Sequence, residues 1–120
     1  RHGRRRGVRG RALSGAGTLV LRAALTGAKA HRDIEIEGAR SLYDLAAAIC
    51  AAVNFDFDHA FGFYSTLTSR YFDSPEIYEL FVDIGESVGE GAKSVKRTKV
   101  AKAFPKVGKK MLFVFDYGDE

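Results

Sequence analysis

Two stretches near the start of the chain place an apolar side chain at every second position. In residues 18–26 the alternating apolar positions are Leu19, Leu21, Ala23 and Leu25. In residues 32–37, Ile34 and Ile36 fall on one face and acidic side chains fall on the other. This period of two is typical of strands that bury one face. The short link between the two stretches predicts an antiparallel hairpin.

A helical pattern begins at Ser41. Apolar side chains recur at helical spacing, at Leu42, Leu45, Ala46, Ile49 and Val53. The Ser41 side chain can cap the first turn, Asp44 favours the positive end of the helix, and Asn54 is a residue that commonly ends helices. We therefore predict one main amphipathic helix here. Cys50 lies on or beside its apolar stripe, which favours a packing role over a reactive thiol, because no basic partner is near in sequence.

The segments after this helix give weaker signals. Residues 59–66 predict a strand with two phenylalanines on one face, and residues 70–75 have turn character. Residues 76–84 fit both the helical and the strand pattern, so their type stays open. Residues 85–91 hold three glycines and predict a loop.

The last strong pattern covers residues 110–117, where both faces are apolar. A strand that is apolar on both faces usually lies in the centre of a sheet. Before it, residues 100–104 fit one helical turn that Pro105 ends. Together these elements predict an α+β fold with a β-hairpin, one main amphipathic helix packed on a mixed sheet, and a central C-terminal strand. A β-grasp-like arrangement is one option.

The first 17 residues are rich in arginine and glycine and have no periodicity. Such a composition buries too little apolar surface to offset the entropy lost on ordering. We predict a flexible arm over residues 1–17 and a single α+β domain over residues 18–120, a natural size for one domain. The arm could contact a polyanion through Arg4, Arg5 and Arg6, or it could be an extension without a selected role.

Charge is unevenly distributed, although the net value is only +4. Six arginines lie in residues 1–11, and without them 13 basic side chains face 15 acidic ones. Residues 93–110 hold eight basic side chains and no acid. Lys96, Arg97 and Lys99 in this segment could contact phosphates, or they could belong to a solvated loop. We expect no aromatic platform for bases, because the nearby phenylalanines are predicted to be in the core.

The order of these elements resembles a known family. The segments SLYDLAAAICAAVNFDFDHAFGFY and KVAKAFPKVGKKMLFVFDYGDE follow the predicted hairpin, separated by a variable middle. Over residues 18–120 the chain resembles the plasmid pRi ORF-three-like family, whose relatives in insertion elements are labelled TnpR-like passenger proteins. The most specific pieces are the helix followed by an acidic turn and His59, and the terminal residues 116–120.

The resemblance implies an α+β domain associated with plasmids and mobile elements, without implying a reaction. Relatives continue past residues 116–120, usually with a tryptophan and at least one more strand. The resemblance therefore implies that the last strand of the family is missing from this chain. In that case the strand ending at Tyr117 would have an exposed edge, which could support self-association.

One cluster of residue types could bind a metal ion. Asp56, Asp58 and His59 are close in sequence, and with Asp116 and Asp119 they could form an oxygen-rich site for a divalent cation. The alternative is that the two aspartates are turn residues and that His59 is a solvated or hydrogen-bonded strand residue. Their spacing matches no known ligand set.

Other functional signals are missing from the sequence. The single Cys50 excludes an internal disulfide and a cysteine-rich zinc site. Residues 85–91 lack the Lys-Ser/Thr pair of a phosphate-binding loop, and we expect no cofactor. No apolar run approaches the roughly 18 residues that span a bilayer, so we expect a cytoplasmic protein without membrane contact.

Two functions remain open from the sequence. The leading hypothesis is a non-catalytic binding module, associated with mobile elements, whose partners are protein or nucleic acid. The alternative is a metal-dependent enzyme that uses the Asp/His cluster.

Overall fold

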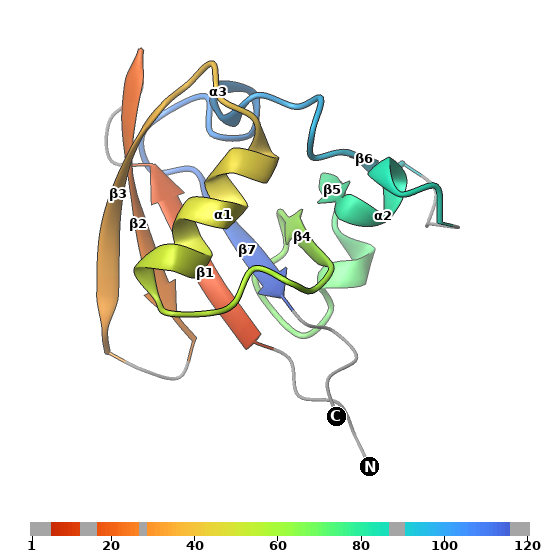
Figure 1. Cartoon of the computed structure of the whole chain (residues 1–120), viewed down its shortest axis with the longest axis horizontal. Coiled ribbons are helices and arrows are strands. Elements are labelled where there is room, and N and C mark those ends of the chain that lie inside the picture. Colours follow the sequence, from red (N-terminus) through yellow and green to blue (C-terminus); the bar gives the residue numbers. More distant parts are fainter. Residues whose placement is uncertain (1–5, 13–16, 27–28, 87–90, 116–120) are drawn as a thin grey trace.

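The chain folds around one mixed sheet with a helix on one face. A computed structural model describes residues 6–12, 17–26, 29–86 and 91–115. Its sheet has seven strands in the order β3-β2-β1-β7-β4-β5-β6, and helix α1 crosses one face of it (Figure 1). The predicted α+β class is confirmed. Within the described residues, no helix is long and apolar enough to cross a membrane.

The predicted hairpin and main helix are confirmed. Strand β2 (Thr18–Leu25) pairs antiparallel with β3 (His31–Glu37), and α1 covers Leu42–Ala52. The side chain of Ser41 accepts a hydrogen bond of 3.0 Å from the backbone N–H of Asp44, as expected for a helix cap. After the helix, Asn54 has a φ of +63°, a left-handed conformation that ends helices.

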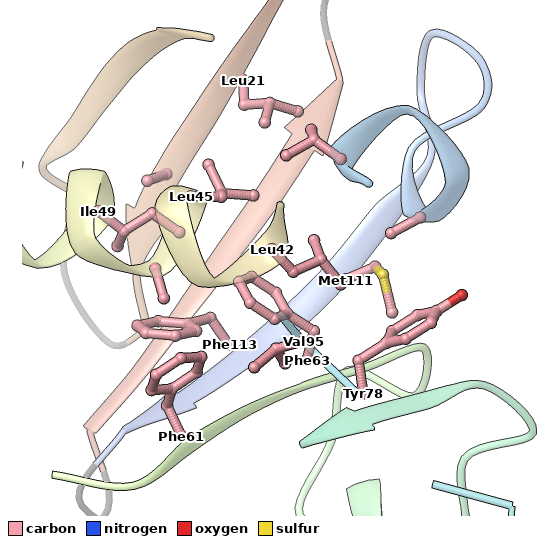
Figure 2. Packing of buried hydrophobic residues seen from close by; sticks show 14 of the residues in the cluster. Leu21, Leu42, Leu45, Ile49, Phe61, Phe63, Tyr78, Val95, Met111 and Phe113 are labelled. Atoms are coloured by element: carbon pink, nitrogen blue, oxygen red, sulfur yellow. The ribbon is translucent and has the colours of Figure 1, made fainter. Parts of the chain in front are cut away.

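The apolar stripe of α1 packs on the strands beneath it. Leu45 and Ile49 point from the helix toward the layer that contains Met111 and Phe113 (Figure 2). Ile49 is 3% exposed and Phe113 is 1% exposed. Cys50 is fully buried in the same core, and this burial raises the pKa of its thiol to about 12. The packing role predicted for Cys50 is confirmed.

The second half of the chain forms short elements around a long last strand. They are β4 (Phe61–Tyr64), η1 (Tyr71–Asp73), β5 (Ile77–Glu79), α2 (Leu80–Asp83), β6 (Lys93–Ser94), α3 (Val100–Ala103) and β7 (Lys110–Phe115). The segment 76–84, whose type the sequence left open, contains both a strand and a helical turn. Strand β7 is the fourth of seven, which confirms its central position.

The structure differs from the predicted flexible arm over part of its length. Strand β1 (Arg6–Ala12) lies between β2 and β7 and pairs antiparallel with both. The composition of a segment indicates how much apolar surface it can bury by itself. It does not account for the backbone hydrogen bonds that β1 gains from two neighbouring strands. Residues 1–5 and 13–16 lie outside the described residues, so the rest of the predicted arm stays a prediction.

This placement of β1 also changes the expected sheet edge. Strand β7 has β1 on one side and β4 on the other, so it is not an edge strand. The edges of the sheet are β3 and β6. In a β-grasp-like arrangement the hairpin strand β2 would neighbour β7, and here β1 stands between them.

Candidate functional site

The predicted residues Asp58 and His59 meet at the start of β4. The carboxylate Oδ1 of Asp58 lies 3.2 Å from Nε2 of His59, and the His59 ring contacts Phe115 edge-on at 5.6 Å between centroids. Both residues line an open cavity of about 220 Å³ whose other walls are mainly aromatic and aliphatic, including Tyr43 and Leu80. The pair could orient a polar group at the mouth of this cavity.

This pair does not by itself make a metal centre. No group of three His, Cys, Asp or Glu side chains that could hold a metal ion occurs among the described residues. Asp56 is exposed, and Asp116 and Asp119 lie outside the described residues. The five-residue metal site therefore stays a prediction, and a divalent cation that binds it should raise the melting temperature.

The basic loop between β6 and α3 is anchored against the start of α1. The backbone N–H groups of Leu42 and Tyr43 donate to the carbonyl oxygens of Thr98 (2.9 Å) and Val95 (3.2 Å). The carboxylate of Asp83 accepts from the N–H of Val95 at 3.1 Å. Since carbonyl oxygens already occupy these first amides of α1, they are not free to bind a phosphate.

The structure places Lys96, Arg97 and Lys99 on this loop, and all three are exposed. The ammonium of Lys96 lies over the ring of Tyr43, 4.9 Å from the ring centroid, a cation–π geometry. Tyr43 is therefore a partly exposed aromatic residue beside a cation, which the sequence analysis did not identify.

The other predicted phosphate contacts are only partly described. Arg4 and Arg5 lie outside the described residues. Arg6 belongs to β1, where its register position is opposite Phe115 on β7. The described part of the predicted arm meets the basic segment 93–110 at one register position, where Arg11 is opposite Lys110.

The register of β1 brings three basic residues into one row across adjacent strands. Arg11 on β1 is directly opposite Arg22 on β2 and directly opposite Lys110 on β7. Arg22 is in turn opposite Asp33 on β3. Residues directly opposite each other have Cβ atoms about 4.5–5.5 Å apart. We call Arg11, Arg22 and Lys110 the cationic row.

The cationic row lies on the face of the sheet that α1 does not cover. Ala23 and Met111 directly follow Arg22 and Lys110 in the sequence, and both are buried in the core under α1. Successive side chains of a strand point to opposite faces. The row residues therefore point to the other side, which we call the outer face.

One carboxylate compensates one of the three charges. The guanidinium of Arg22 contacts Asp33 through two hydrogen bonds, of 2.9 and 3.2 Å. Hydrogen bonding from Arg22 lowers the pKa of the Asp33 carboxyl below its usual value. Arg11 and Lys110 are exposed, and neither forms an ion pair with the described residues. Like charges directly opposite each other destabilise a sheet.

The cationic row was missed in the sequence because its members are far apart along the chain. Arg22 is at an outward position of an alternating strand, and this signal was visible in the sequence. Its two partners were counted only as parts of a basic arm and a basic segment. Their direct opposition depends on β1, which the sequence pattern did not predict.

The chain was compared with known proteins at the level of families, sequences and structures. No family model, no curated protein and no solved structure matches it. The proposal of a function therefore depends on the geometry of the site.

Proposed function

We propose that this chain is a non-catalytic binding module for nucleic acid, which it holds by the phosphates against the outer face of its sheet. The observation that carries the proposal is the cationic row, in which Arg11 stands between Arg22 and Lys110. Three neighbouring cations with one carboxylate partner favour an anion that neutralises the remaining charge. The phosphates of a nucleic acid backbone supply a row of such anions.

On the β2 side, the surroundings of the row favour phosphate contacts over base recognition. The described side chains of β2 and β3 on the outer face include no Phe, Tyr or Trp that could stack on a base. On the β7 side, Tyr64 and Tyr71 are buried against Leu112 and Val114, and Phe72 beside them is exposed. Phe113 and Phe115 are buried on the opposite face under α1. Contacts to phosphates position a protein without reading sequence, so we expect binding that depends on salt and little on sequence.

Acidic residues beside the row limit its extent. Asp33, Glu35 and Glu37 lie on β3, next to β2 at the edge of the sheet. They repel phosphates, so the contact would extend from β2 across β1 to Lys110 at the start of β7 rather than over β3. Beyond Lys110, the outer-face residues Leu112 and Val114 of β7 are buried. The resemblance to plasmid and insertion-element proteins is compatible with a nucleic acid partner, and membership of that family is part of this proposal.

The test is a titration of a fluorescent 20-base-pair duplex with the protein at low salt, followed by anisotropy. We expect Arg11→Gln and Lys110→Gln each to weaken binding several-fold, because each loses one phosphate contact. Lys29→Gln is the matched control, since Lys29 is exposed in the link between β2 and β3 and its loss changes the net charge equally. The control should bind like the wild type.

Two outcomes would overturn the proposal. If all three variants weaken binding equally, net charge explains the binding and the row has no special role. If polyglutamate competes better than the duplex itself, the partner is an acidic protein segment and not a nucleic acid.

A further inference from the structure

We infer that the docking of β1 between β2 and β7 completes the phosphate-binding site, so that nucleic acid binding and β1 docking stabilise one another. This inference rests on the proposed function, because it concerns the same cationic row. It adds a coupling between the ligand and one strand of the fold.

The first reason is that β1 supplies the middle residue of the row. Adjacent strands lie about 4.8 Å apart, so Arg22 and Lys110 on the two flanking strands are separated by about 10 Å. Arg11 fills the position between them and is directly opposite both. Without β1 the three-residue row does not exist, and two separate cations remain.

The second reason is that β1 is intrinsically a poor central strand. Its sequence, RGVRGRA, has two glycines and three arginines in seven residues, and Val8 is its one β-branched residue. Glycine is depleted in strands and loses more backbone entropy on ordering than other residues. Backbone pairing with β2 from Val8 to Ala12, and with β7 from Arg6 to Arg11, is what holds the strand in place.

The third reason is that docking places like charges side by side. When β1 docks, Arg11 approaches two cations, and only Arg22 has a carboxylate partner among the described residues. A bound phosphate chain removes this repulsion and binds the docked state more tightly than the undocked one. A ligand that prefers one state shifts the population toward it, and the coupling is reciprocal.

Hydrogen–deuterium exchange of the whole chain, with and without the 20-base-pair duplex, tests the coupling. We expect the amides of residues 8–11 to exchange at least threefold more slowly in the complex. The amides of α1 from Leu45 to Cys50 serve as the internal control and should change much less. Lys110→Gln should reduce the protection of β1 at the same concentration of duplex.

A strand variant tests the reverse direction. Gly10→Pro removes a backbone N–H within β1 and disfavours its pairing with two neighbours, while Arg11 is retained. Duplex binding should fall at least as far as in Arg11→Gln. A variant that pairs poorly yet binds like the wild type would contradict the coupling, and the exchange measurement on the wild type does not depend on the folding of this variant.

The outcomes separate the inference from the proposed function. Duplex binding with unchanged exchange in β1, or with equal slowing in β1 and α1, overturns the coupling but leaves nucleic acid binding in place. Absence of duplex binding to the wild type overturns both.

Discussion

Gly38 is a position at which an added methyl group would meet close neighbours on three sides. A Cβ added there would lie 2.9 Å from Cδ1 of Leu19 and 3.0 Å from both the carbonyl oxygen of Gly17 and the Cβ of Ala101. The backbone N–H of Gly38 also donates to that carbonyl at 2.7 Å, so the two segments cannot separate without losing the bond. This close approach joins the start of β2 to α3.

We therefore expect Gly38→Ala to lower the free energy of unfolding by about 1–3 kcal/mol, the usual cost of overpacking. Urea denaturation of the variant and the wild type measures this difference in the free energy of unfolding. The exposed neighbour Ala39 provides the control, because Ala39→Ser should change stability by no more than about 0.5 kcal/mol. Equal stability of Gly38→Ala and the wild type would show that the segments move apart at little cost.

The carboxylate of Glu76 is held by two partly buried partners. Its carboxylate accepts from Nζ of Lys109 at 2.7 Å and from the hydroxyl of Tyr78 at 2.6 Å. Burial opposes ionisation, but these two hydrogen bonds and the positive charges of Lys109 and Lys93 together lower the pKa of Glu76 below its usual value. A carboxyl with a lowered folded-state pKa stabilises the fold above its unfolded pKa, about 4.3, and this contribution is lost as the pH falls further.

The pH dependence of unfolding should therefore change in Glu76→Gln. Wild-type stability should fall as the pH drops from about 5 to 3, and the variant should show a shallower decrease over that range. Urea denaturation at each pH gives the comparison. An identical slope in the two proteins would mean that Glu76 has the same pKa in the folded and unfolded states.

At the scale of elements, α1 is the element that its own sequence specifies most completely. Ser41 caps it, its apolar stripe is buried, and Asn54 ends it with a left-handed φ. These signals are local, so they could be read from the sequence without knowledge of the rest of the fold. The same holds for the hairpin and for β7, whose alternation is strong.

Ser41→Ala tests the cap. It removes the hydrogen bond to the N–H of Asp44, and we expect a loss of about 1 kcal/mol of stability. Ser41→Asp should retain most of the wild-type stability, because aspartate also caps helices. If the alanine variant is as stable as the wild type, the backbone contacts from Thr98 and Val95 suffice to hold the first turn.

Strand β1 shows where local patterns fail. Its arginines and glycines are typical of a segment that does not order by itself, and the pairing partners that order it lie 9 to 109 residues away in sequence. Residues 76–84 are ambiguous for a different reason. They contain β5 and α2 in succession, and each element is too short to give a clear periodicity. In both segments the conformation depends on pairing and packing with the rest of the sheet.

At the scale of the whole molecule, the formation of the cationic row depends on the register between strands. Arg11, Arg22 and Lys110 form a row only because β1 pairs as it does with both neighbours. A shift by one residue would send Arg11 to the opposite face. The helix, the hairpin and the last strand could be predicted from the sequence, whereas this row could not, because no local pattern encodes register between distant strands.

The most direct test of the cationic row is the salt dependence of duplex binding. Each neutralised phosphate contributes a slope of about −0.9 to the logarithm of the binding constant against the logarithm of salt concentration. Arg22 is already paired with Asp33, so the two contacts of Arg11 and Lys110 predict a slope of about −1.8 for the wild type. This slope corresponds to a loss of affinity of about 12-fold between 50 and 200 mM salt. For Lys110→Gln the slope should be shallower by about 0.9, while Lys29→Gln keeps the wild-type slope. A wild-type slope near zero, or equal slopes for the two variants, would contradict phosphate binding by the row.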